Sequence, residues 1–263
     1  MRQYFNLKRL GRLLRKQLTD YYINYLLGLG VLLGGLLLLI GGFVYWEYRI
    51  FPVRTQEGFF VMLLLATGSF FTSTVFAALG DKRQAATLLT LPASQLEKYL
   101  AGWLLSLVGF TLVYLVAFYT VDVLLLQLLR LRGGLPHTLF NIFSPQSPVL
   151  AWLLVYYPLL HAVMLYGSIF FQKSQFVRTA ALSLLAVLVL CLANWQALSV
   201  LFHRQVGLAF PFGEVSVHDN ELSYYVAYTS LPAGQLPWLD ALPLVLAVML
   251  WVAAYFRLAE KQL

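Results

Sequence analysis

Long apolar runs alternate with short polar connections along most of this chain. Six of the runs reach the length of about 20 residues that crosses a hydrocarbon core about 30 Å thick. Each is predicted to be a helix, because an isolated strand would leave backbone groups unpaired in lipid. The predicted spans cover residues 22–45, 59–79, 100–126, 148–171, 177–197 and 238–256.

Composition supports a membrane protein over a soluble one. Of the 263 residues, 60% are hydrophobic and only 11% are charged, whereas soluble domains are nearer half apolar and a quarter charged. We therefore expect an all-α integral membrane fold, with residues 1–263 forming a single transmembrane domain.

The basic residues predict the orientation of the spans. Thirteen of the 18 lysines and arginines lie in the two terminal segments and in the second and fourth connections. The positive-inside rule puts these segments in the cytoplasm, with both termini. The net charge of +7 thus reflects topology and not a nucleic-acid surface, which would be a solvated patch on a folded domain.

Residues 1–20 form the most polar segment, and a helical wheel predicts an amphipathic helix there. Five basic residues share about one third of the circle, and leucines gather on the other side. The basic set is Lys8, Arg9, Arg12, Arg15 and Lys16. Such a helix is expected to lie in the membrane interface, its charges facing anionic lipid headgroups or a cytoplasmic partner. The alternative is that the charges only anchor the topology.

The cytoplasmic connection at residues 81–98 has a distinctive pattern. Residues 82–90 have the composition of a short helix, and Pro92 then interrupts the backbone. Ser94 and Glu97 have the spacing of a capping box, in which each side chain accepts a hydrogen bond from a backbone N–H at the start of the third span. The leucines of the short helix would have to dip into the membrane interface or into a groove on a partner protein.

This layout resembles a permease subunit of the type-2 ATP-binding-cassette (ABC) transporter superfamily. The basic elbow helix, the six spans and the coupling segment carry the resemblance, and residues 91–98 are similar to permeases from Bacteroidetes-type bacteria. The matching positions in the coupling segment are Asp81, Lys82, Arg83, Leu88, Leu89, Thr90, Leu91, Pro92, Ala93, Ser94 and Lys98.

The resemblance implies a subunit of an exporter in the bacterial cytoplasmic (inner) membrane. A second permease copy, in a homodimer or heterodimer, and separate ABC-type ATPase subunits would complete it, with ATP and Mg on the ATPases and no cofactor in this chain. The elbow and coupling helices would contact the ATPase, the latter through Asp81, Lys82, Arg83, Gln84, Leu88, Leu89, Leu91 and Pro92. No lysine follows a glycine here, so the chain has no phosphate loop of its own.

A few polar groups fall within the predicted spans. Asp122 is a functional candidate as an intramembrane acid, although its place near the predicted outer interface would let it reach water. His161 is a second candidate, with hydrogen-bonded packing as the more ordinary interpretation. Residues 72–74 are hydroxyl-bearing and are expected to bond backbone carbonyls or neighbouring helices, and the glycines of the first span suit close helix packing.

The loop at residues 199–237 is predicted to face outside and to hold a hairpin, with strands at 214–218 and 221–228. Its metal-capable side chains match no zinc spacing. The single Cys191 excludes a disulfide within the chain, and no motif predicts a catalytic site.

Three functions remain open from the sequence. The first is the ATPase-coupled permease. The second is a stand-alone carrier or membrane-embedded enzyme, and the third is a structural or assembly subunit of the same fold.

Overall fold

The computed structural model describes residues 5–47, 51–76, 94–131, 138–144, 147–171, 173–202, 207, 215–219, 224–228 and 237–260. The chain forms two compact units. The first comprises Met1–Phe176 with Pro243–Leu263, and the second is Val177–Leu242.

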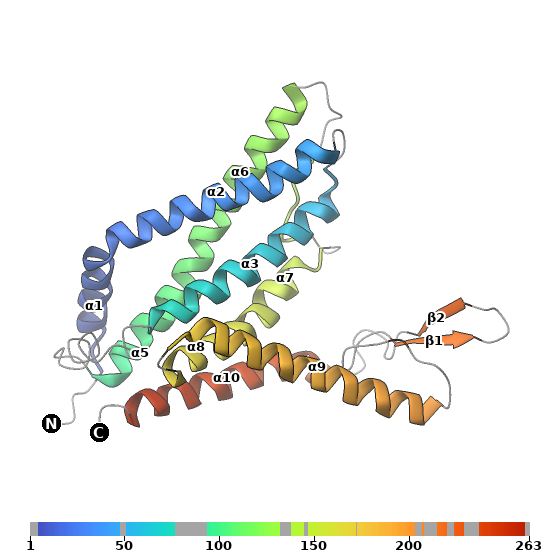
Figure 1. The fold of residues 1–263 in the computed structure, drawn as a ribbon. Helices are drawn as coiled ribbons and strands as arrows, with labels where there is room; N and C mark the ends of the chain where they lie inside the picture. Colours follow the sequence, from blue (N-terminus) through green and yellow to red (C-terminus); the bar gives the residue numbers. More distant parts are fainter. Residues whose placement is uncertain are drawn as a thin grey trace. The chain divides into compact units, whose positions relative to one another are not determined.

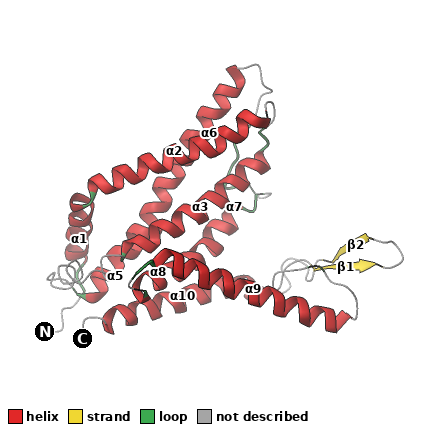
Figure 2. Ribbon diagram, in the orientation of Figure 1, coloured by secondary structure: helices red, strands yellow, loops and turns green. Residues whose placement is uncertain are grey.

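Helices make up most of the described chain (Figures 1 and 2). In order, the elements are α1 (Leu7–Asp20), α2 (Tyr22–Glu47), α3 (Val53–Val75), α5 (Gln95–Trp103), η2 (Leu104–Gly109), α6 (Phe110–Leu131), α7 (Val149–Ala151), η3 (Trp152–Tyr156), α8 (Tyr157–Phe170), α9 (Gln175–Phe202), β1 (Val215–Asp219), β2 (Tyr224–Tyr228) and α10 (Pro237–Glu260). The segments η2 and η3 are π-helical turns inside otherwise α-helical spans.

Six helical segments are long and apolar enough to cross a membrane, as predicted. They are Tyr22–Trp46, Val53–Val75, Gln95–Leu131, Val149–Phe170, Gln175–Leu201 and Ala241–Glu260. The second begins earlier than predicted, because the polar residues from Arg54 to Gly58 form its first turns and not a loop. The third extends beyond both predicted ends, since a helix need not stop at the edge of the hydrocarbon core.

The core of the first unit lies between α2, α3 and α6, and aromatic rings fill much of it. Phe60 is fully buried at its centre. Its ring centroid lies 5.1 Å from that of Phe118, 5.3 Å from Tyr114 and 5.4 Å from Phe140. Phe140 comes from the segment after α6, so this connection is part of the core.

Gln56 joins the segment after α6 to the start of α3 through hydrogen bonds. Its side chain is fully buried, and Nε2 donates to the carbonyl oxygens of Phe51 and Thr138, both at 3.1 Å. Its Oε1 accepts from the backbone N–H of Phe140 at 3.0 Å. A buried amide satisfied in this way can be tolerated in an apolar core.

The helices α3 and α8 pack closely at Gly68. A Cβ atom at Gly68 would lie 2.6 Å from Cε2 of Tyr157 and 2.8 Å from its hydroxyl oxygen. Tyr157 is almost completely buried, so it cannot swing away into solvent. The contact therefore requires glycine, as close helix packing in membranes often does.

The second unit contains most of α9 and the hairpin. The two strands pair in antiparallel fashion, with Val217 opposite Val226 and Asp219 opposite Tyr224. The predicted hairpin is thus present and adds strands to the predicted all-α fold. Its first strand reaches Asp219, which the sequence pattern had placed in the turn.

Candidate coupling site at the start of the third span

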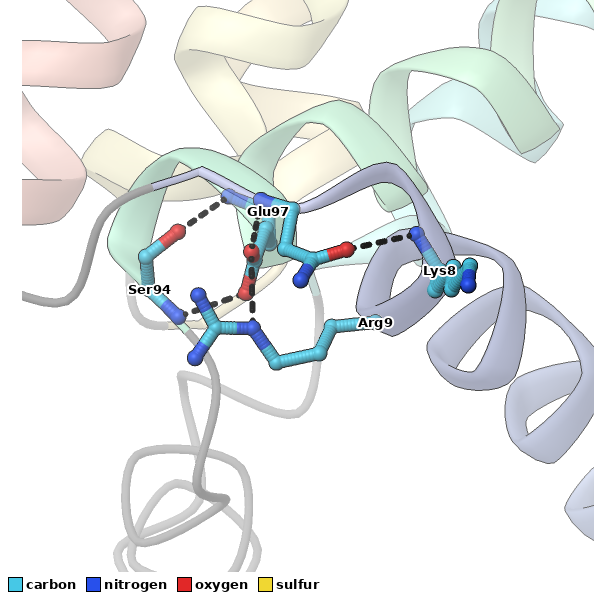
Figure 3. A network of polar contacts seen from close by, with 5 residues as sticks. Lys8, Arg9, Ser94 and Glu97 are labelled. Atoms are coloured by element: carbon cyan, nitrogen blue, oxygen red, sulfur yellow. Dashed lines mark hydrogen bonds and ion pairs between the residues drawn. The ribbon is translucent and has the colours of Figure 1, made fainter.

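The helices α1 and α5 begin beside the same carboxylate, that of Glu97 (Figure 3). Asn6 is the N-cap of α1, and its side-chain oxygen accepts from the backbone N–H of Lys8 at 2.9 Å. Ser94 is the N-cap of α5, and its hydroxyl oxygen accepts from the backbone N–H of Glu97 at 3.2 Å. Two helix starts that are far apart in sequence therefore share one polar centre.

Glu97 joins the two caps through both of its carboxylate oxygens. The backbone N–H of Ser94 donates to Oε2 at 2.9 Å, which completes the predicted capping box. The backbone N–H of Asn6 donates to Oε1 at 2.8 Å. The carboxylate thus caps its own helix and also holds the start of α1.

Arg9 adds a cation to the same centre. Its Nε lies 3.3 Å from Oε1 of Glu97, and the carboxylate is fully buried while the Arg9 side chain is 34% exposed. The positive ends of two helix dipoles also meet at Glu97. A buried charge needs this kind of surrounding, because an unpaired one would be costly.

The other basic residues of α1 do not share this buried site. Lys8, Arg12, Arg15 and Lys16 are exposed. The predicted basic set is therefore divided: Arg9 turns toward α5, and the remaining four form an outward surface.

The predicted coupling residues Asp81, Lys82, Arg83, Gln84, Leu88, Leu89, Leu91 and Pro92 lie outside the described residues. The described chain resumes at Ser94, directly after Leu91-Pro92-Ala93. Ser94, the next residue in the sequence, belongs to the Glu97 centre.

His161, the second intramembrane candidate, is a packing residue that joins three spans. It is almost completely buried, and its Nε2 lies 2.8 Å from Oγ of Ser106 in η2. Trp251 Nε1–H from α10 donates to its Nδ1 at 3.2 Å. The hydrogen bonds expected of a packing histidine are therefore present.

The same network argues against a serine nucleophile here. Ser106 Oγ–H donates to the carbonyl oxygen of Gly102 at 2.8 Å. Since Nδ1 of His161 accepts from Trp251, the neutral ring carries its proton on Nε2 and donates it to Ser106. A general base would need the opposite arrangement, with Nε2 free to take the hydroxyl proton.

Asp122 is fully buried on α6, which corrects the expectation that it reaches interfacial water. The helix α2 packs along α6, and Gly41 of α2 lies beside Leu125, about one turn from Asp122. Among the residues that the structure describes, neither carboxylate oxygen of Asp122 has a hydrogen-bond partner.

The remaining polar positions in the spans have local roles. Thr72, Ser73 and Thr74 each donate to a backbone carbonyl within α3, as expected. Of the glycines in α2, only Gly41 would bring an added Cβ near another side chain, that of Leu125 at 3.6 Å. Within the described ranges, no group of three or more metal-capable side chains comes together.

Sequence reasoning missed Asn6 and Gln56. An asparagine just before an amphipathic run is an N-cap signal, so Asn6 could have been found as the start of α1. Its backbone bond to Glu97 has no such signal, because it depends on tertiary packing. Gln56 sits in a polar stretch typical of a loop, and nothing local distinguishes it from its exposed neighbours.

Comparison of the chain with protein-family models, with curated proteins and with solved structures gives no match. Its function is therefore argued from the membrane-spanning helices and from the contacts around Glu97.

Proposed function

We propose that the chain is the membrane-spanning permease subunit of an ATP-driven exporter in a bacterial inner membrane. A separate ABC-type ATPase would dock on the elbow helix α1 and on the coupling segment at residues 81–98. The observation that carries this proposal is the shared Glu97 centre, which ties the elbow helix to the start of the third span.

A link of this kind suits the transmission of force. The last part of the coupling segment contains Ser94, whose backbone N–H donates to the Glu97 carboxylate. From Gln95 the third span continues as one helical segment to Leu131, a lever about 55 Å long at 1.5 Å per residue. Movement of the coupling segment would therefore pass to α1 and to the whole third span together.

The remaining parts of the assembly follow from this proposal. ATP and Mg would bind the partner ATPase, and a second permease copy would complete the path through the membrane. Within the described residues, the tautomer of His161 leaves the Ser106 hydroxyl without a general base, which speaks against an enzyme that uses this serine as its nucleophile.

Association with the ATPase tests the proposal. The tagged chain is co-expressed with a candidate phosphate-loop ATPase from the same genome, purified, and assayed for bound ATPase and for ATP hydrolysis. We expect a stable complex in the parent chain. Leu88→Glu or Leu89→Glu should lower ATPase retention at least about tenfold, because a charge in an apolar contact costs several kcal/mol.

Leu139→Glu is the matched control. Leu139 is an exposed leucine on the predicted outer side, so the same change there should leave the complex intact. A chain that never retains an ATPase would overturn the proposal. Activity of the purified chain alone would favour a carrier or enzyme, and loss of a surface assembly without altered export would favour a structural subunit.

A further inference from the structure

The surface of α1 is divided into three lengthwise strips. One packs toward the protein and includes Arg9, Leu10 and Leu13, of which Leu10 is buried. The second is apolar and open, with Leu7 72% and Leu18 49% exposed. The third is open and basic. It contains Lys8, Arg12, Arg15 and Lys16.

The two open strips lie side by side around the helix. Glu97 contacts the packed strip through Arg9 and the backbone of Asn6. These contacts fix the rotation of α1 about its own axis, so the exposed leucines cannot turn toward the protein. An apolar strip beside a basic strip is typical of a helix that lies in a membrane interface. Its leucines then contact the acyl chains, and its cations lie among the headgroups.

Aromatic residues indicate the depth of the junction between α1 and α2. Tyr21, the only non-helical residue between them, is 47% exposed, and Tyr22 is 58% exposed. At the other end of the first span, Tyr45 and Trp46 are also exposed. Tyrosine and tryptophan gather at the two membrane interfaces, so the end of α1 that joins α2 lies at headgroup level. Figure 1 shows that α1 turns away from the line of α2.

We propose that the basic strip of α1 binds the phosphate-bearing headgroups of anionic phospholipids in the bilayer around the protein. Charge complementarity selects this occupant, because four exposed cations lie on the strip and the one acidic residue in α1, Asp20, lies at its last position. Each lysine or arginine near an anionic surface adds attraction that falls off within a Debye length. The inference does not depend on an ATPase, which in the proposed assembly would dock at the Glu97 end of α1 and leave the basic strip to lipid.

Lipid-selective fluorescence quenching tests this proposal on the full chain without any partner. Cys191 is replaced by alanine, and a fluorophore is attached at Gly11→Cys, where an added Cβ meets nothing within 4 Å. The protein is reconstituted in phosphatidylcholine vesicles that contain phosphatidylglycerol. Quenching by a headgroup label on phosphatidylglycerol is then compared with quenching by the same label on phosphatidylcholine.

We expect preferential quenching by phosphatidylglycerol that weakens at high salt. The double variant Arg12→Gln/Arg15→Gln should lower the preference about 25-fold, at roughly fivefold per charge. The control Arg54→Gln/Arg130→Gln removes two exposed arginines from other elements and should leave it unchanged. Equal quenching by both lipids, or equal loss in both double variants, would overturn the proposal. Equal quenching would leave the ATPase test of the proposed function unaffected.

Discussion

A buried carboxylate is costly unless several donors surround it, and Glu97 has such donors from two helices. Two backbone N–H groups and the Arg9 guanidinium point to its oxygens. Removing the negative charge would leave these donors facing a neutral group. Glu97 is therefore expected to matter more than an ordinary capping residue.

The variant Glu97→Gln tests this residue. One end of the glutamine amide is a donor, so it cannot accept from both Asn6 and Ser94, and the loss should cost about 1–3 kcal/mol. Because α1 is held mainly at this point, its backbone amides should exchange hydrogen at least about fivefold faster. Hydrogen exchange with mass spectrometry on the peptides of residues 7–20 measures the effect.

Glu260→Gln is the control for that measurement. Glu260 is exposed and pairs with Arg257 on the same helix at 2.6 Å, a kind of contact that contributes little to stability. Exchange in α1 should be the same as in the parent chain. If Glu97→Gln also leaves α1 unchanged, the link between the elbow helix and the third span is not held by this carboxylate.

At the scale of elements, apolar run length was enough to predict the six spans, because the membrane demands about 20 apolar residues per crossing. It could not predict where the helices end. The helix α3 begins several residues before the predicted start of the second span and includes polar residues such as Gln56. Whether such a residue is helical and buried depends on hydrogen-bond partners from distant segments. The π-helical segments η2 and η3 likewise have no sequence signal that we could identify.

The capping box was predictable because Ser94 and Glu97 act through local spacing. The amphipathic character of α1 was predictable from periodicity. Their meeting at Glu97 was not predictable, since it joins residues 91 positions apart. The division of the basic residues into Arg9 and an outward set follows from that meeting, and so it also required the structure.

Helix packing between α3 and α8 gives a second stability test. Gly68→Ala would force a methyl group against the buried ring of Tyr157, and overpacking of this kind costs about 1–3 kcal/mol. The apparent unfolding temperature of the purified chain in detergent should fall by about 2–10 °C.

Gly34→Ala provides the comparison, because an added Cβ there meets nothing within 4 Å. It should leave the unfolding temperature unchanged or raise it slightly, given the better helix propensity of alanine. Equal midpoints for the two variants would mean that the Gly68 contact is not tight in the membrane protein as purified.

At the scale of the whole molecule, the start of the third span is joined to α1 through Glu97. An ATPase that moves the coupling segment would shift both. The basic strip of α1, bound to lipid headgroups, would keep α1 at the membrane surface and prevent its rotation. Movement of the coupling segment would then shift the third span.

The most direct test is a distance measured with and without nucleotide. Spin labels are placed at Gly11→Cys on α1, which should move with the third span, and at Phe256→Cys, an exposed position on the separate span α10, in a chain whose Cys191 is alanine. Pulsed electron paramagnetic resonance is recorded on the complex with its ATPase. We expect ATP with Mg to shift the distance distribution between the labels. An unchanged distribution in a complex that hydrolyses ATP would mean that ATPase movement does not reach α1.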